Sequence, residues 1–171
     1  MKITVRNFRK KDSIHVQNMM NKLANFHGDT IKTTPKDFAK YCLGAKKLAH
    51  CRLAWHKKEP VGFIISYSFI NFVRGFTCQH IDLIFVEDKF RRQNVGKALI
   101  QAVALDAVAV GHQRLSVAAQ TSNIGANKFY QKLGFSTKTS TSVNYNVQDD
   151  KLLLLSELEN TIEDAIAWAR K

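Results

Sequence analysis

The sequence is poor in proline, cysteine and acidic residues, and it has no long apolar run. No stretch of about 20 apolar residues is present, which excludes a conventional membrane-spanning helix. The first residues are strongly charged, with Lys2, Arg6 and Arg9 and no apolar segment behind them, so they do not resemble a secretory signal. These absences predict a soluble protein that stays in the cytoplasm.

Cysteine and histidine are present without the spacing that metal sites need. The three cysteines, Cys42, Cys51 and Cys78, are odd in number and far apart, and they form no C-x-x-C pair. The six histidines include no H-x-x-x-H pair. The sequence therefore predicts buried or unreactive thiols in a reducing compartment and no metal site.

Acidic residues are scarcest in the first third of the chain. Residues 1–60 hold 14 Lys and Arg against four Asp and Glu, and they carry most of the formal net charge of +12. Such a surface attracts polyanions, because phosphate contacts give affinity without sequence reading. The excess of positive charge has two alternative explanations: the surface binds an RNA or ribosomal partner, or the lysines are simply solvated. Residues 149–171 reverse the balance, with six acids against three bases.

The 171 residues and 45% hydrophobic content fit one domain with a substantial core. The two prolines fall at boundaries between expected elements. Pro60 is expected to close a turn between two strands. We expect a domain over residues 1–148, followed by an acidic amphipathic helix over 149–171 that packs on this domain or on a second copy in a homodimer. Alternation and capping signals predict strands at 3–6, 48–55, 61–72, 76–86, 115–119 and 141–147, and helices from 12 or 13 to 26, 34–43, 95–110 and 123–133.

An apolar strand runs directly into a basic, amide-rich turn that opens an Ala-rich helix. Unpaired N–H groups at a helix N-terminus, with the positive end of the helix dipole behind them, form an anion site. Gly96 allows close approach of the backbone, and Arg91, Arg92 and Lys97 add positive charge. The turn is therefore predicted to seat a pyrophosphate.

Two motifs occur in a fixed order around this turn. The first is Gln93-x-x-Gly96-x-Ala98, and the second begins at Asn123 and ends in Phe129-Tyr130-x-x-Leu133-Gly134-Phe135. Together they resemble the two hallmark motifs of the GCN5-related N-acetyltransferase (GNAT) family over roughly residues 3–147. The resemblance implies a mixed α/β (α+β), mostly antiparallel sheet flanked by helices, with a splayed strand pair that holds acetyl-CoA. It implies an N-acetyltransferase that uses acetyl-CoA as a co-substrate and needs no metal.

The resemblance also implies which residues bind the cofactor. In the family the pyrophosphate lies on the backbone amides of the turn, and the pantetheine arm pairs with the strand ahead of it. Asn94 stands where many members have glycine, but Asn tolerates the left-handed backbone. The expected cofactor-binding residues are Ile84, Phe85, Val86, Arg91, Arg92, Gln93, Asn94, Val95, Gly96, Lys97, Ala98, Asn123, Phe129, Tyr130 and Lys132. Asn123 has the alternative role of capping its helix.

Three residues are candidates for the chemistry of acetyl transfer. Tyr130 matches the family tyrosine that acts as general acid toward the sulfur, and a core role is its alternative. Asp82 falls where some polyamine acetyltransferases of the family have a glutamate base, and it acts directly, through water or only structurally. His80 shares the face of Asp82 on a regular strand, whereas a β-bulge, common in this strand of the family, would shift it to the other face.

The acceptor is the least defined part of the prediction. Residues 61–86 look like the corresponding part of diamine and polyamine acetyltransferases, and family acceptor sites lie around residues 14–43. That region offers only Asp29 and Asp37, so a polyamine site requires both to converge with Asp82. A small amine or amino-acid-like metabolite is the favoured acceptor. The alternatives are a protein N-terminus, a ribosomal component, an aminoacyl-tRNA, or an inactive module that binds acetyl-CoA or nucleic acid.

Overall fold

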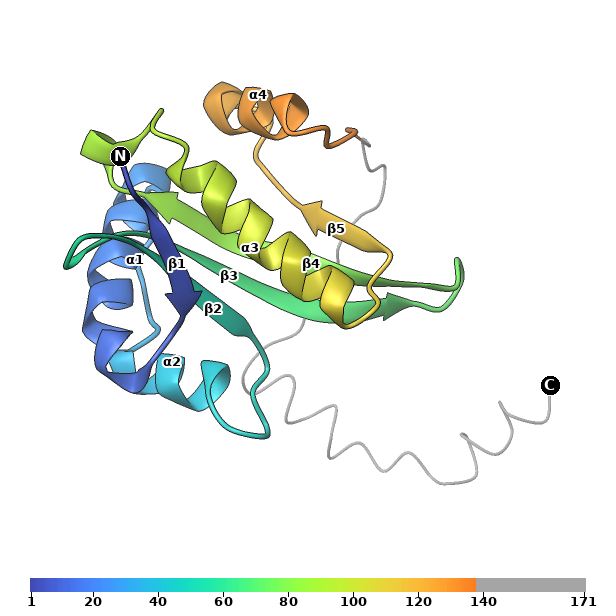
Figure 1. Ribbon diagram of the computed structural model, residues 1–171, viewed down its shortest axis with the longest axis horizontal. Coiled ribbons are helices and arrows are strands. Elements are labelled where there is room, and N and C mark those ends of the chain that lie inside the picture. The colour runs from blue at the N-terminus through green and yellow to red at the C-terminus, as the bar shows by residue number, and fades with distance from the viewer. Residues whose placement is uncertain (138–171) are drawn as a thin grey trace. The chain divides into compact units, whose positions relative to one another are not determined.

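The computed structural model describes residues 1–137, of which Met1–Ser136 form one compact unit around a five-stranded sheet (Figure 1). The strands follow one another across the sheet in sequence order. The first four are antiparallel, and the fifth runs parallel to the fourth. The strands are β1 (Thr4–Asn7), β2 (His50–His56), β3 (Glu59–Asn71), β4 (Phe76–Val86) and β5 (Arg114–Val117).

The described residues contain four α-helices, of which three lie between strands and the fourth follows β5, and local sequence signals explain several of their ends. Thr34 and Asp37 form a capping box at the start of the second helix, and Gly28 ends the first helix with a φ of 74°. A helical crossover joins the parallel strands β4 and β5, as a parallel pair requires. The helices are α1 (Ser13–His27), α2 (Pro35–Cys42), α3 (Val95–Ala109) and α4 (Ile124–Lys132), with short 3-10 turns η1 (Lys10–Asp12) and η2 (Asp88–Phe90).

The sheet is covered on both faces, and each face has its own apolar core. Phe63, Ile65 and Phe85 pack with α1 and α2 on one face, whereas Ile64 and Ile81 pack with α3 and α4 on the other. Figure 1 shows α3 running across the sheet over β3 and β4, which it also contacts. Within the described residues no helix is long and apolar enough to cross a membrane.

The pairing of β4 with its two neighbours changes along its length. β5 pairs with β4 only from Cys78 to Ile81, so β4 continues to Val86 with no partner on that side among the described residues. On the other side, Ile65 pairs with Leu83 but Ser66 pairs with Ile81. Asp82 is therefore the extra residue of a β-bulge, at the position where β4 and β5 part.

The predicted order of elements is confirmed through α4, with small shifts in the ends. The prediction that Pro60 closes a turn is wrong: Pro60 lies within β3 and pairs with Trp55, so only Lys57 and Lys58 form the connection. Proline is tolerated near the start of a strand because its missing N–H costs little there. The strand predicted at 141–147 and the helix predicted within 149–171 lie outside the described residues.

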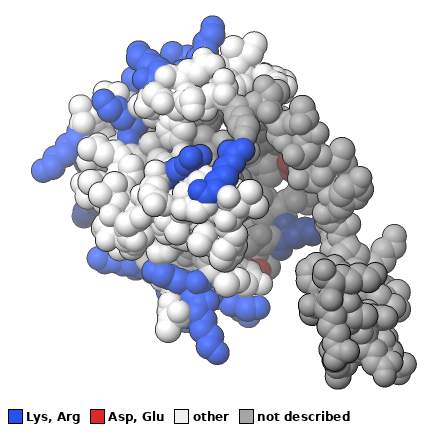
Figure 2. Space-filling model, turned by 90° about the vertical axis from the view of Figure 1, so that its right-hand side faces the viewer, with Lys and Arg blue, Asp and Glu red and all other residues white. Residues whose placement is uncertain are grey.

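Positive charge dominates the surface of the described residues. They include 22 Lys and Arg against eight Asp and Glu, and five of the eight carboxylates form ion pairs with Lys or Arg. Figure 2 shows one face with Lys and Arg side chains spread over it and very little acidic surface. The chain's few acids are thus largely occupied, and most cations face solvent without a carboxylate.

Candidate active site

The turn before α3 has the backbone shape of an anion site. Arg92 and Asn94 have positive φ angles of 60° and 63°, and Asn94 is the residue immediately before the helix. The first helical hydrogen bond runs from the Ala98 N–H to the Asn94 carbonyl at 3.0 Å. The N–H groups of the three residues before Ala98 therefore have no helical acceptor, and successive donors in such a turn form an anion-binding nest. The expectation that Asn94 adopts the left-handed conformation is confirmed.

Side chains around the turn divide into those that build it and those that face solvent. The Arg91 guanidinium donates to the Val86 carbonyl at 3.1 Å and pairs with Asp88 at 2.6 Å. The Gln93 amide donates to the Lys89 carbonyl at 2.8 Å. These contacts hold the turn in shape.

Two predicted cations of the turn are available for a ligand, and one predicted residue is not. Arg92 and Lys97 are exposed, and no carboxylate of the described residues pairs with either. Val95 is buried in the core, so only its backbone can contribute. A hollow of about 460 Å³ lies against the turn and is lined by Met1, Ile3, Gln93, Asn94 and Ala98. Its volume is within the range of ordinary ligand sites.

Helix α4 lies over the turn and brings the second motif to the first. A Cβ added at Gly96 would lie 3.1 Å from Cζ of Phe129, so this glycine makes room for the ring in addition to any ligand. The Asn123 side chain accepts from the Ala126 N–H at 3.0 Å, which establishes its capping role. Its contact with the pantetheine arm stays a prediction. Lys132 is exposed on the same helix.

Tyr130 lies with its ring in the core on the α3 side of the sheet. The ring packs between Phe129 and Phe135, at centroid distances of 5.3 and 5.6 Å. No described residue hydrogen-bonds to its hydroxyl. Burial raises the pKa of Tyr130, which keeps the phenol protonated and able to donate.

His80 and Asp82 do not share a face as they would on a regular strand. The strand contains the β-bulge that is the alternative expectation, and Asp82 is its extra residue. His80 lies opposite Tyr67 on the face that α1 and α2 cover, whereas Ile84, four residues on, lies in the core under α3. The alternation therefore shifts by one residue at Asp82, which is exposed and makes no ion pair with any described residue.

His80 is held in place by β5, through a contact that the sequence does not reveal. Its Nδ1 lies 2.8 Å from Oγ of Ser116, the residue beside it on the parallel strand. Cys78 Sγ lies 3.3 Å from the same oxygen. A serine in a short strand carries no distinguishing signal, so only the strand register identifies Ser116.

The predicted pantetheine residues occupy the unpaired end of β4. Ile84, Phe85 and Val86 follow the bulge, and β5 has already left the strand at Ile81. Their backbone groups on that side have no strand partner among the described residues, as a strand-like ligand requires. Arg91 already occupies the Val86 carbonyl.

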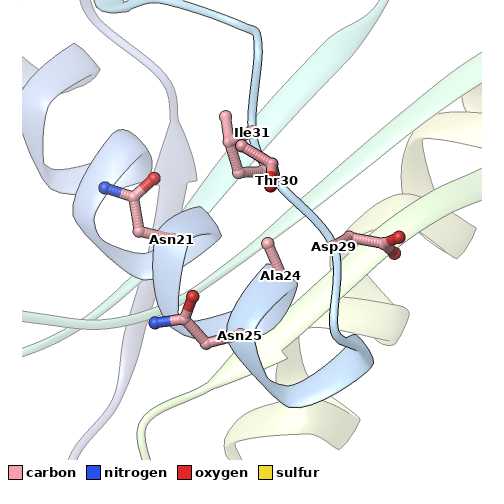
Figure 3. A pocket seen from close by; sticks show the side chains of 6 residues that line it. All are labelled: Asn21, Ala24, Asn25, Asp29, Thr30 and Ile31. Atoms are coloured by element: carbon pink, nitrogen blue, oxygen red, sulfur yellow. The ribbon is translucent and has the colours of Figure 1, made fainter.

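A small polar hollow lies between the last turns of α1 and the segment that follows it, within residues 14–43, the region predicted to shape the acceptor site (Figure 3). Its volume is about 190 Å³, which is below the usual range for ligand pockets. Figure 3 shows the Asp29 carboxylate directed away from Asn21 and Asn25. Asp37 accepts hydrogen bonds from Thr34, which lower the pKa of its carboxyl. Asp29 and Asp37 thus lie on separate segments, and Asp37 is hydrogen-bonded within the cap of α2.

The thiols are buried as predicted, and they form no disulfide. Burial raises the pKa of Cys42 and, with nearby Cys42 and Asp12 adding to the effect, that of Cys51, so both favour the neutral thiol. Among residues 1–137, no group of three or more His, Cys, Asp or Glu is placed to hold a metal ion.

A family model described as the acetyltransferase (GNAT) domain matches residues 14–149, which is most of the chain. The chain belongs to the GNAT family of acetyltransferases. This membership accounts for the mixed sheet, the parted strands and the basic turn, and it makes acetyl-CoA the co-substrate that the fold uses.

Solved GNAT structures share the fold at low sequence identity. AAC(6')-Iy in complex with the bisubstrate analogue CoA-S-monomethyl-acetylneamine has a TM-score of 0.73 at 20% identity, over 87% of this chain and 100% of that one. The aminoglycoside acetyltransferase meta-AAC0020, from an uncultured soil metagenomic sample and in complex with sisomicin, has a TM-score of 0.71 at 16% identity, over 86% and 97%. Ribosomal-protein-alanine N-acetyltransferase from Brucella melitensis biovar Abortus 2308 has a TM-score of 0.65 at 20% identity, over 86% and 99%.

The residues around the parted strands fit acetyl-CoA. The turn at Arg92 and Asn94 leaves the N–H groups at the start of α3 without a helical acceptor, which suits a pyrophosphate. The bare edge of β4 beyond Ile81 suits an extended amide-bearing arm. The Tyr130 hydroxyl makes no hydrogen bond to a described residue, so it can donate to a ligand atom.

Proposed function

We propose that this protein transfers the acetyl group of acetyl-CoA to a primary amine by direct attack in a ternary complex. We propose a small amine or an amino-acid-like metabolite as the acceptor. The observation that carries the proposal is the parting of β4 and β5 at the Asp82 bulge, with the phosphate turn and the Tyr130 helix beside it. Beyond this bulge the backbone groups of β4 have no strand partner on the β5 side among the described residues, so a ligand can pair with them.

In this proposal, one set of residues binds the cofactor and another transfers protons. When bound, acetyl-CoA supplies an activated acetyl thioester. The N–H groups at the start of α3, with Arg92 and Lys97, hold its phosphates. The edge of β4 at Ile84, Phe85 and Val86 holds its arm by strand-like pairing. The remaining requirement is proton movement between the amine and the departing sulfur.

Two proton transfers complete the reaction. The neutral amine nitrogen forms the bond to the acetyl carbon, and the carbon–sulfur bond breaks. Tyr130 donates its phenolic proton to the departing sulfur, and its raised pKa suits a donor rather than a base. His80 or Asp82 accepts the proton that the amine nitrogen loses, directly or through water.

Release of free thiol in the presence of an amine tests this proposal. The protein is incubated with acetyl-CoA and a panel of amines, peptides with free N-termini and aminoacyl-tRNA, and thiol is followed with time. We expect thiol release that depends on at least one small amine. Cofactor binding without thiol release on any acceptor would show an inactive acetyl-CoA-binding module instead.

A second candidate acceptor is a protein N-terminus, a ribosomal component or an aminoacyl-tRNA. The supporting observation is the excess of 22 cations over eight acids in the described residues, with five of those acids already paired. A similar fold occurs in a ribosomal-protein-alanine N-acetyltransferase. Activity restricted to the peptide or tRNA members of the panel would favour this acceptor class.

We also infer a cytoplasmic location and a homodimer, both from sequence. Three buried thiols without a disulfide suit a reducing compartment. The apolar stripe predicted within 149–171 needs a covering surface, in this chain or in a second copy. Sedimentation velocity at two concentrations tests the dimer, which predicts a sedimentation coefficient that rises with concentration.

A further inference from the structure

An open aromatic surface lies next to the parted strands. Tyr67 on β3 is directly opposite His80 on β4, with ring centroids 5.2 Å apart, and Phe69 lies 6.4 Å from the same imidazole. Tyr67 and Phe69 are 38% and 39% exposed, although both lie within a long strand of the sheet. We call Tyr67, Phe69 and His80 the aromatic surface.

This surface is open because its neighbours end before it. β2 pairs with β3 only as far as Ser66, and the core under α1 and α2 reaches Ile65. Tyr67 and Phe69 continue the same face of β3 by strand alternation, beyond the cover of these helices. Large rings left half exposed on a sheet face are typical of ligand-binding surfaces.

The aromatic surface borders the proposed reaction centre. His80 is one residue before Ile81, which makes the last pair with β5, and the bulge at Asp82 follows. A ligand that rests on the rings therefore reaches the point where the strands part. This continuity argues for the acceptor, since the cofactor is proposed to bind at the turn and along the edge of β4, on the other side of the bulge.

Ser116 fixes the orientation of the imidazole at this border. Its Oγ is 2.8 Å from Nδ1 of His80, and a hydroxyl can donate or accept, so it serves either state of that nitrogen. With Nδ1 engaged on β5, Nε2 is the ring nitrogen left for a ligand. Ser116 thus acts on the reaction through His80 and is a positioning residue.

The surrounding charges limit what kind of amine fits. Asp82 is the acid nearest in sequence to the aromatic surface. Asp37 accepts hydrogen bonds from Thr34 at the start of α2, and Asp29 lines the hollow at the end of α1. One carboxylate suits one ammonium group, whereas a polyamine needs several. The rings offer apolar contact and a favourable face for a cation.

We propose that the aromatic surface is the acceptor subsite and takes a primary monoamine carried on an aromatic or apolar group, with Ser116 positioning His80 toward the amine. The inference rests on the proposed acetyltransferase activity. The acceptor's ring lies on Tyr67 and Phe69, and its nitrogen lies beside His80 and Asp82. The alternative occupants of this surface, another segment of the chain or a second copy, are outcomes of the test.

The first experiment compares phenethylamine, ethylamine and spermidine as acceptors for the full chain. For phenethylamine, Tyr67→Ala and Phe69→Ala should raise KM by about 10-fold with little change in kcat, because the rings bind without reacting. The KM for ethylamine should change much less. Phe72→Ala is the matched control, since Phe72 is 84% exposed at the hairpin between β3 and β4, where no acceptor is proposed.

The outcomes separate this proposal from the proposed function. Thiol release with spermidine but not phenethylamine, or an unchanged KM in both ring variants, would overturn the subsite while leaving acetyl transfer intact. No thiol release with any amine would overturn the acetyltransferase proposal itself. A lower sedimentation coefficient or melting temperature in the ring variants, with KM unchanged, would show that another protein surface covers the rings.

The second experiment tests Ser116 as a positioning residue. Ser116→Ala should lower kcat by about 10-fold and shift the acidic limb of the pH–rate profile, and Ser116→Thr should restore both because it keeps the hydroxyl. Ser68→Ala is the matched control, since Ser68 hydrogen-bonds Gln79 and His112 instead. An unchanged pH profile in Ser116→Ala would contradict the positioning role.

Discussion

At the scale of single residues, Tyr130 combines a buried ring with a hydroxyl that no described residue engages. Its packing between two phenylalanines fixes the ring, and burial raises its pKa, so the phenol stays protonated and able to donate. The sulfur of a thioester gains negative charge as the carbon–sulfur bond breaks, and it can then accept this proton. The residue is therefore suited to protonate the sulfur.

Tyr130→Phe removes this proton and little else. We expect kcat to fall by about 100-fold, because general acid catalysis contributes roughly that much, while acetyl-CoA affinity stays near that of the native protein. Steady-state kinetics and calorimetric titration measure the two quantities. Since the pKa is raised, native activity should keep its proton donor up to and above about pH 10, the ordinary tyrosine value. An unchanged kcat in the variant would remove Tyr130 from the mechanism.

Asp12 illustrates a residue whose importance is structural. Its carboxylate is buried and accepts hydrogen bonds from Arg6 at 2.7 and 2.9 Å and from the Arg9 N–H at 2.8 Å. Burial alone would raise its pKa, but these hydrogen bonds and the Arg6 charge outweigh it and lower the pKa. Arg6 also lies over the Trp55 ring, so the pair links β1, η1 and β2.

Asp12→Asn should lower the free energy of unfolding by about 2–4 kcal/mol at pH 7, because it leaves a half-buried guanidinium without its charge partner. A lowered folded-state pKa stabilises the protein above the unfolded value of about 3.9, and this stability is lost as pH falls through the folded value. The difference between native protein and variant should therefore shrink below about pH 4. Urea unfolding at pH 7 and pH 3 measures it, with Asp29→Asn as the exposed control. Equal differences at both pH values would contradict the linkage.

At the scale of elements, the turn before α3 depends on one helix packing over another. Gly96 faces the Phe129 ring of α4, so the first motif is joined to the second by direct contact. Arg92 and Asn94 have positive φ, and the N–H groups of the three residues after Asn94 have no helical acceptor. A side chain at position 96 would disturb both the ring and the phosphate seat.

Gly96→Glu should reduce acetyl-CoA affinity by about 100-fold or more, because it adds bulk and a negative charge where phosphates bind. The fold should survive, since the nearest atoms belong to a side chain that can move. Calorimetric titration and circular dichroism test these expectations. Gln101→Glu adds the same charge on the exposed side of α3 and should leave affinity unchanged. Normal affinity in Gly96→Glu would contradict the placement of the pyrophosphate.

The order of elements and the phosphate turn are predictable from the sequence because their signals are local. Helix α3 follows from an Ala-rich run after a turn, and the left-handed Asn94 follows from the tolerance of Asn for that conformation. Arg92 adopts the same conformation with no such preference, so the sequence does not indicate it.

The register of β4 could not be read from the residue pattern, because tertiary packing sets it; the splayed strands and the bulge alternative come only from the family resemblance. Residues 61–66 of β3 are all buried, since helices cover both faces, and a continuous apolar run hides the alternation that reports register. The bulge at Asp82, which decides where His80 faces, therefore leaves no trace in the pattern. Ser116 approaches His80 only through the parallel pairing of β5 with β4.

At the scale of the whole molecule, the part of the chain that the structure describes has few unpaired carboxylates, so its surface repels cations. Lys36 and Lys40 are exposed one turn apart on α2, and Lys46 and Lys47 are exposed in the loop after it. That loop folds back on the helix, because the N–H groups of Leu48 and Ala49 both donate to the Tyr41 carbonyl. Four exposed cations thus lie along α2 and the loop that follows it.

Replacing Lys36, Lys40 and Lys46 with Glu should weaken binding to a structured RNA. The slope of log K against log salt concentration should become shallower by about one to three, because fewer counterions are released. Acetylation of a small amine should not change. Fluorescence anisotropy over a salt series measures binding, and reversal of Lys57 and Lys58 is the control. If the α2 reversal and its control have equal effects, the attraction is general rather than centred on α2.

The central claim is that one acetyl group passes from acetyl-CoA to an amine nitrogen at the parted strands. The most direct measurement quantifies both products of one reaction, free thiol by absorbance and N-acetylated amine by mass spectrometry. We expect equal amounts of the two, formed by the native protein and strongly reduced in Tyr130→Phe. Thiol without acetylated amine would mean hydrolysis, and neither product on any acceptor would mean a protein that only binds the cofactor; either result would contradict the claim.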